Sequence, residues 1–457
     1  MMSSSYFFAG FFMRKRDKII RRGVGAMLLG AAMTMWAATA RAQEEPMTTI
    51  DAPAVVTLEQ AARAALAYHQ PFQISQETVT QLVQRRRRVF SAMLPKITLR
   101  ADALRRRNPI AGLRTEDDLG INVTLEQPLF AGGKSTSGLR SASAQLHAGE
   151  QAAHQAKESL LLSVAGAYYE VLKARKRSEL FDAERTRLRE HRRSAEVQLK
   201  VGQVTKTVLL RAEAELAGAE ANLLRAQADE AVARNELALL TGLPVDVALD
   251  VPAAPAPPPM TPDTLIADAE QQRPELLRSR FNEQAARHNV GVARSGLFPT
   301  IDLELTYEDS SREPAVGFMS EVKDKYALVR LTFPLFEGGL QIAKIQEARS
   351  LWRAAALDAA FVKETVGTEV RSAARNVEAL AGSVEHFTAQ VRFAKENYEL
   401  VTRQFAVGLA ANIDLLDANT TLLSAEQELA AATFDRDLSV FELYRSIGRL
   451  SAYLLNE

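Results

Sequence analysis

Two acidic residues, Asp414 and Asp417, stand three positions apart near the start of a predicted helix, in the segment NIDLLDANTTL. Residues three apart share one face of a helix, so the two carboxylates would present a local negative charge. Such a charge attracts cations and repels anions. A simpler explanation also fits, because acidic residues in the first turn of a helix complement the positive end of its dipole.

The other side chains that could do chemistry are poorly placed for it. His147 and His154 are two helical turns apart, roughly 10.5 Å, which is too far for them to share one metal ion. The chain has no cysteine, so we expect no disulfide, thiolate metal site, cysteine nucleophile or lipid-modified N-terminal cysteine. Phosphate-loop, Ser-His-Asp and HExxH patterns are also absent from the sequence. We therefore predict no catalytic residue, no metal site and no other cofactor.

Residues 1–42 have the pattern of a secretory signal peptide. A basic segment from Arg14 to Arg22 precedes an apolar run from Gly23 to Ala38, which is shorter than the ~20 residues of a membrane-spanning helix. Cleavage is therefore favoured over a retained anchor. Beyond residue 42 no stretch is apolar enough for a membrane helix, so a membrane role would require a β-barrel or a peripheral site.

The charge balance changes when this segment is removed. The whole chain has 56 basic and 56 acidic residues, and without residues 1–42 it would have 49 and 55. Without a basic excess we expect no nucleic-acid partner. The strongest basic cluster, Arg85 to Arg88, resembles a nucleic-acid patch but falls at the end of a predicted helix, just before the predicted strands. There it would complement the helix C-terminus or anionic lipid head groups.

Proline placement divides the chain into halves. No proline occurs in the 115 residues from Leu129 to Leu243 or in the 123 residues from Leu335 to Glu457, as long helices require. Six prolines fall within residues 252–262, which we interpret as a linker with polyproline character.

The two halves repeat one another. VTLEQPLFAGG at 123–133 recurs as VRLTFPLFEGG at 329–339, an offset of 206 residues that also relates Gly202 to Gly408. The match needs no insertion over roughly 120 residues, which indicates a regular helical rod, because one added residue would rotate every later side chain. We predict an N-terminal extension at 43–56, repeat 1 at 57–251, repeat 2 at 263–450 and a C-terminal tail at 451–457.

Each repeat is predicted to contain a helix, two strands and a long helical hairpin. The first helices open at Thr57, with a capping-box pattern, and at Pro262. Four segments alternate apolar and polar residues as tilted transmembrane strands do; we expect them at about 97–107, 118–130, 298–309 and 324–336. Leucines spaced by seven indicate coiled-coil packing of the long helices. Those helices are expected at 134–200, 204–241, 340–406 and 411–447, with Gly202 and Gly408 in the turns.

The predicted strands cannot form a closed barrel within one chain, and open strand edges are not tolerated in a bilayer. Chains must therefore combine their strands. Two chains would give eight strands and a filled bore, whereas three would give twelve and a water-filled lumen. The polar inner faces favour the water-filled lumen. A one-sided sheet on a soluble core is the alternative source of the same alternation.

The order of these features resembles the TolC-type outer-membrane efflux proteins: LP, an alternating hairpin, QPLF-GG, a long helix, a VG turn, DLLDA-TLLSAEQELA and a closing glycine. The resemblance covers residues 57–450 and includes the tandem duplication. It implies a mainly α-helical membrane protein in which a homotrimer shares a twelve-stranded transmembrane β-barrel, four strands from each chain. A periplasmic coiled-coil α-helical barrel would continue it, and its tip would dock to a periplasmic adaptor and an inner-membrane transporter.

The resemblance also implies roles for individual residues. Asp414 and Asp417 match acidic residues of the family's periplasmic constriction, where three chains would place six carboxylates. The first repeat has Val208 and Arg211 at the equivalent positions, so only one helix pair supplies acids. The family's closed state can use an arginine where this chain has Ala410. The predicted adaptor-docking tips are Val201, Gly202, Gln203, Val407, Gly408 and Leu409.

We therefore predict an outer-membrane exit duct of a tripartite efflux or type I secretion system, which passes substrates from an inner-membrane pump and an adaptor to the exterior. The alternatives are a periplasmic coiled-coil scaffold and a passive outer-membrane porin. Outer-membrane lipid is an expected partner. The pattern does not decide whether the cargo is a drug, a metal ion or a polypeptide.

Overall fold

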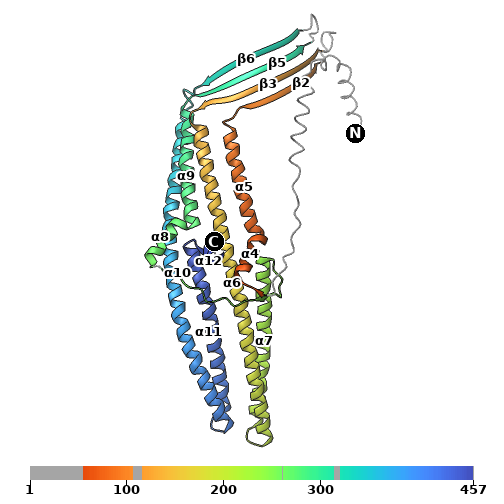
Figure 1. Ribbon diagram of the computed structural model, residues 1–457, viewed down its shortest axis with the longest axis vertical. Coiled ribbons are helices and arrows are strands. Elements are labelled where there is room, and N and C mark those ends of the chain that lie inside the picture. The colour runs from red at the N-terminus through yellow and green to blue at the C-terminus, as the bar shows by residue number, and fades with distance from the viewer. Residues whose placement is uncertain (1–54, 107–115, 260, 313–319, 456–457) are drawn as a thin grey trace, which may run out of the picture. The chain divides into compact units, whose positions relative to one another are not determined.

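A computed structural model of the chain describes residues 55–106, 116–259, 261–312 and 320–455 (Figure 1). The predicted signal peptide and residues 43–54 of the predicted N-terminal extension lie outside these ranges. Within them, no helix is long and apolar enough to cross a membrane.

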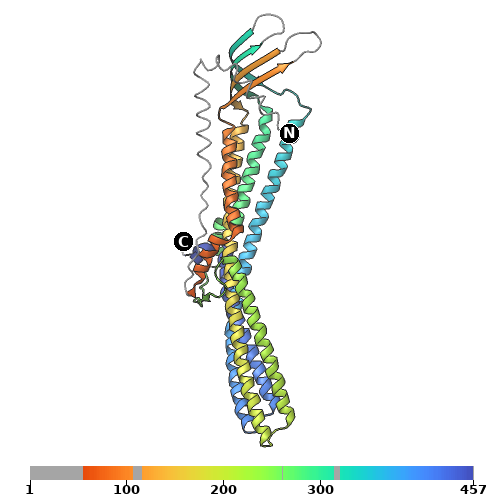
Figure 2. The same ribbon diagram turned by 90° about the vertical axis from the view of Figure 1, so that its right-hand side faces the viewer.

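Four long strands form one antiparallel sheet in the order β2-β3-β5-β6 (Figure 2). They are β2 (Lys96–Arg106), β3 (Glu116–Ala131), β5 (Thr300–Arg312) and β6 (Ser320–Thr332). Ile97 lies opposite Leu125, which lies opposite Leu305, which lies opposite Ala327. The next row across the sheet is Thr98, Thr124, Thr306 and Tyr326. Since neighbouring rows point to opposite faces, the sheet has one apolar and one polar face, as the alternation predicts.

Prolines shape the ends and the register of these strands. β5 begins two residues later than predicted, after Pro299, and β6 ends four residues earlier, before Pro334. Proline has no N–H for the strand ladder, so Pro299 and Pro334 disfavour continued pairing at these two strand ends. Pro128 lies inside β3, where the register with β5 shifts between Pro128 and Phe130.

Two helical hairpins follow the two halves of the sheet. In repeat 1, α6 (Lys134–Lys200) pairs with α7 (Lys206–Thr241); in repeat 2, α10 (Leu340–Ala406) pairs with α11 (Asn412–Ser446). α6 and α10 each have 67 residues and the bounds expected from the sequence. Both begin directly after two glycines with positive φ, which explains the repeated GG pair. At Gly132 a Cβ atom would also lie 2.6 Å from the carbonyl oxygen of Ser295.

Each repeat opens with two helices, so the prediction of one helix is wrong. Repeat 1 begins with α4 (Leu58–Tyr68) and α5 (Gln70–Ser91), and repeat 2 with α8 (Pro262–Gln272) and α9 (Pro274–Arg294). The linking residues, His69 and Arg273, are extended, with ψ of 107° and 120°. Pro71 and Pro274 stand in the first turns of α5 and α9, where proline begins a helix but cannot continue the preceding one.

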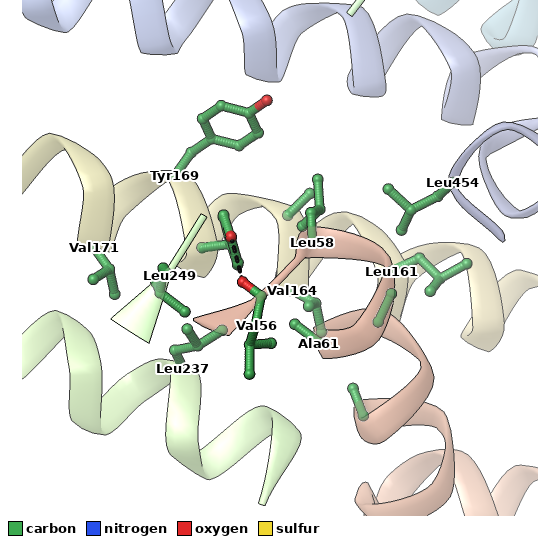
Figure 3. Packing of buried hydrophobic residues seen from close by; sticks show 14 of the residues in the cluster. Val56, Leu58, Ala61, Leu161, Val164, Tyr169, Val171, Leu237, Leu249 and Leu454 are labelled. Carbon is green, nitrogen blue, oxygen red and sulfur yellow. Dashed lines mark hydrogen bonds between the residues drawn. The ribbon is translucent and has the colours of Figure 1, made fainter. Parts of the chain in front are cut away.

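An apolar cluster around the middle of α6, here called the central core, joins both repeats (Figure 3). A two-stranded parallel sheet that the sequence analysis missed, β1 (Val55–Val56) with β4 (Ala248–Leu249), contributes Val56 and Leu249 to it. Leu161, Val164 and Tyr169 come from α6, and Phe441 comes from α11. The Thr57 capping box at the start of α4 is present: the Thr57 hydroxyl accepts the N–H of Gln60, whose side chain accepts the N–H of Thr57.

The C-terminal segment forms a buried helix where the analysis predicted a tail. α12 (Leu450–Leu455) packs Leu450, Leu454 and Leu455 into the central core. The buried carboxylate of Glu158 on α6 accepts the backbone N–H groups of Leu450 and Ser451, at 3.1 and 3.0 Å. A carboxylate on the first N–H groups of a helix stabilises its start. Three leucines and one distant glutamate thus hold this segment in place.

Candidate gate and docking tips

Two tight turns with the same backbone geometry join the paired helices. Gly202 lies between α6 and α7, Gly408 lies between α10 and α11, and both have φ 77°. In each turn the residue after the glycine donates its N–H to a carbonyl five residues earlier, over 2.9 Å. This bond and the left-handed glycine define a Schellman motif, the usual way to end a helix tightly.

The residues predicted to dock an adaptor are all exposed at these turns. Val201 is 65%, Val407 70% and Leu409 80% exposed. Single exposed apolar residues are ordinary on protein surfaces. Here large apolar side chains stand at the ends of two hairpins that contact one another, so the tips present apolar surface suited to a protein partner.

The structure brings Asp414 and Asp417 together on α11, both exposed. The Oδ2 atom of Asp414 accepts the N–H of Ala411 over 2.8 Å, so this carboxylate also stabilises the start of the helix. At the equivalent positions of α7, Val208 is half-buried and Arg211 is exposed. Asp414 thus has a structural role as well. At these two equivalent positions, only repeat 2 places acidic side chains near the tips.

Sequence reasoning missed His191, a buried residue of α6 that links the two hairpins. Its Nε2–H donates to Oδ1 of Asn412, the first residue of α11, over 2.7 Å. Phe405, in the last turn of α10, lies edge-on to the imidazole with ring centroids 5.4 Å apart. Burial lowers the pKa of His191, and the hydrogen bond to Asn412 acts against this shift. A lone histidine has no distinguishing spacing, so only the packing of α6 against α11 reveals it.

Other polar groups continue this contact along α6 and α11. Arg187 lies 3.5 Å from Glu426 as an ion pair without hydrogen-bond geometry. Glu184 and Asn419 are buried, and in the part of the chain that the structure describes one oxygen of each lacks a hydrogen-bond partner. Burial raises the pKa of Glu184 despite the nearby Arg187. We call Glu184, Arg187, His191, Asn419 and Glu426 the polar seam.

Comparison with known proteins identifies the family to which a chain with this sheet and these helical hairpins belongs. The sequence matches the family described as "Outer membrane efflux protein" at residues 84–243 and 265–449, which lie in the two repeats. The chain belongs to this family. It is 29% identical over 374 residues to the outer membrane protein TolC of Vibrio cholerae, covering 79% of this chain and 83% of that protein. It is also 31% identical over 343 residues to protein CyaE of Bordetella pertussis, covering 72% and 70%.

The fold of this outer membrane efflux protein agrees with the family assignment. The solved structure of the transmembrane channel CusC superimposes with a TM-score of 0.77 at 16% identity, over 86% of this chain and 92% of that one. The family fold is a tandem-repeat helical barrel with a β-barrel end, and its members are channel proteins. The protein is an exit duct of the outer membrane with a periplasmic extension. The predicted family, fold class, duct function and location are therefore confirmed.

Proposed function

We propose that three copies of the chain assemble into this duct, and that its tips dock to a periplasmic adaptor linked to an inner-membrane pump. The open sheet is the observation that supports the assembly. β2 and β6 are its edge strands, and in a sheet of four antiparallel strands they run in opposite directions. β6 of one copy can therefore pair with β2 of the next as an antiparallel ladder, which leaves no edge open to lipid.

The long helices support the same assembly. α6 has 21 buried residues, whereas α10, of equal length and at the same place in its repeat, has eight. Leu351, Leu357 and Phe361 of α10 are exposed in the single chain. A neighbouring copy would cover this apolar surface and provide the burial that α10 lacks.

The gate proposed for this trimer is the pair Asp414 and Asp417. Three copies would bring six carboxylates around the periplasmic entrance, which would favour cations over anions. Their position near the Gly408 turn places this charge where the helical barrel would be entered.

Assembly is tested on protein extracted from outer membranes, which should migrate as a heat-resistant trimer. Because the chain has no cysteine, pairs of cysteines introduced along β2 and β6 report only the contact between copies. We expect disulfide-linked chains from the edge strands and none from matched cysteines on the central strands β3 and β5. A soluble monomer after signal removal would refute the assembly.

The gate is tested by single-channel recording in planar bilayers. Asp414→Ala with Asp417→Ala should raise conductance or weaken cation preference. Glu215→Gln, which removes an exposed acid from the equivalent helix of repeat 1, is the matched control and should change neither. If the double variant conducts like the wild type with the same ion preference, the carboxylates do not form the gate.

Docking is tested with Val201→Asp and Leu409→Asp, which place charge on the apolar tips without changing the glycines. We expect this variant to lose co-purification with a periplasmic adaptor and to keep heat-resistant trimers. Deletion of the gene should make cells sensitive to exported compounds. Reduced uptake without such sensitivity would instead indicate a passive porin.

A further inference from the structure

One end of each of α5, α6 and α9 adjoins the sheet (Figure 1). These three ends are rich in basic residues. Residues 78–95, 134–147 and 284–297 contain these ends and hold four, two and two Lys or Arg residues, with no Asp or Glu. All eight side chains are exposed. We call this set the basic collar: Arg85–Arg88, Lys134, Arg140, Arg287 and Arg294.

The charge of the basic collar is not neutralised within the described ranges of the chain, where none of its members has an ion-pair partner. Arg86 makes one hydrogen bond, from Nε to the Ser143 hydroxyl over 3.1 Å. Farther from the sheet, arginines are commonly paired: Arg192 contacts both Glu196 and Glu213. The positive charge beside the sheet is therefore free to attract an anionic group from outside the chain.

A cavity of about 590 Å³ opens between α6, α9 and α10 within this region. Arg287, His288 and Arg294 line it together with Trp352 of α10. Burial lowers the pKa of His288, and the positive charges of Arg140 and Arg287 lower it further. The cavity is large enough for a phosphate-bearing group and its lining is cationic.

The basic collar lies within about two helical turns of the helix ends that adjoin the sheet. Arg85 is six residues before the end of α5 at Ser91, which is ~9 Å along the helix axis. Head groups occupy roughly 5–7 Å on each side of the hydrocarbon, and the long, flexible side chain of arginine can keep its charged end in such a polar layer. Between the cations and the apolar sheet face, Phe90, Leu94 and Ile97 are exposed.

We propose that the basic collar binds the phosphate groups of anionic phospholipids in the leaflet that faces the periplasm. A guanidinium donates two parallel hydrogen bonds to phosphate, and basic clusters beside a membrane span attract anionic lipid surfaces. Four consecutive arginines cover most directions around α5, so some face outward whichever side packs on α6. The proposal rests on the outer-membrane location and is independent of the gate and the adaptor.

The test uses assembled full-length protein from outer membranes in a neutral detergent, with bound lipids counted by native mass spectrometry. Phosphatidylglycerol and phosphatidylcholine are offered in equal amounts. We expect a preference for phosphatidylglycerol of about tenfold or more that weakens as salt rises from about 50 to about 500 mM. Replacing Arg85–Arg88 with glutamine should abolish most of this preference, and replacing them with lysine should preserve most of it.

A second variant and a control make the outcome decisive. Arg287→Gln with Arg294→Gln should reduce the preference by a smaller factor, and it decides the matter if the α5 variant does not assemble. Arg193→Gln with Arg225→Gln removes two exposed arginines from α6 and α7 and should leave the preference unchanged. The proposal is overturned if assembled collar variants keep the wild-type preference. A change of ion selectivity in planar bilayers with unchanged lipid counts would likewise overturn it, because the cations would then face the lumen.

Discussion

The central core and the polar seam both hold α6 against α11, but with opposite kinds of side chain. In the central core, Tyr169 packs on Phe434 and Phe441 of α11, with ring centroids 6.2 and 5.8 Å apart. In the polar seam, the Arg187–Glu426 pair spans 3.5 Å without a hydrogen bond. When the two helices separate, the stabilisation from apolar burial is lost entirely. Polar groups lose less, because they form hydrogen bonds to water instead. Nearer the tips the apolar contacts are smaller: Leu180 and Phe181 cluster with Leu423, and Leu188 clusters with Leu416. The same two helices are thus held more firmly at the centre than near the tips.

This difference has a consequence for the proposed gate. α11 carries Asp414 and Asp417 at the less firmly held end, next to Asn412 and its contact with His191. We therefore expect the α10–α11 hairpin to separate from α6 at the tips while the central core stays closed.

Breaking the central core should disrupt the whole protein. Leu161 is fully buried there, and replacing a buried leucine with alanine costs about 2–5 kcal/mol through lost burial and a residual cavity. We expect Leu161→Ala to lower the melting temperature and the yield of assembled protein sharply. Leu239→Ala removes a leucine that is 74% exposed and should change neither. Equal melting curves for the two variants would mean that the central core does not supply the main stability of the fold.

Making the polar seam apolar should hold the tips closed. Apolar replacement of a poorly solvated ion pair is often neutral or stabilising, by about 1–4 kcal/mol. We expect Arg187→Leu with Glu426→Leu to lower the mean conductance in planar bilayers. Arg187→Ala alone leaves Glu426 without its partner and should raise conductance. The contrast between core and seam fails if both variants move conductance in the same direction.

Local signals in the sequence were sufficient for much of this architecture. The proline-free runs and the glycine pairs predicted α6 and α10, because proline is excluded from helix interiors and each glycine pair directly precedes a helix start. Alternation predicted the two faces of the sheet, since side chains alternate along every strand. The pairing of Asp414 with Asp417 followed from helical spacing alone.

Other features depend on contacts between distant segments. α12 is short, and it is held by Glu158 and the central core, which its own six residues do not reveal. To predict the polar seam, one must know how α6 and α11 are rotated relative to each other, and the sequence of neither helix alone determines this. The basic collar shows an intermediate case, because Arg85–Arg88 stand out in the sequence while Arg287 and Arg294 join them only in the folded chain.

The two inter-helix turns, at Gly202 and Gly408, have the same backbone geometry in both repeats. A Cβ atom on Gly202 or Gly408 would meet nothing within 4 Å, so alanine there is strained only by φ of 77°. That strain costs about 1 kcal/mol and should be equal in both repeats. We expect Gly202→Ala and Gly408→Ala to speed hydrogen exchange at their own turns by similar factors. Only Gly408→Ala should also alter conductance, because only that turn precedes the acids on α11.

The smallest predicted effect is the response of the polar seam to pH. The pKa of His191 in the folded chain is lowered from 6.5, chiefly by burial, so folding favours its neutral form. Its contribution to stability is complete above about pH 6.5 and falls as the pH drops below it, because the separated state takes up the proton first. The pKa of Glu184 is raised chiefly by burial and also by the negative charge of Glu215 on α7, so this group acts in the opposite direction and stabilises the folded arrangement as the pH falls.

The effects of His191 and Glu184 can be separated by substitution. His191→Gln keeps a donor for Asn412 without a titrating group, and it should remove the increase in tip hydrogen exchange between about pH 7 and pH 5.5. Glu184→Gln removes the opposing group and should make tip hydrogen exchange rise more steeply than in the wild type as the pH falls toward the usual range of a glutamate. If both variants keep the wild-type pH profile, the seam does not respond to protonation, and its weakness relative to the central core arises from unsatisfied hydrogen bonds alone.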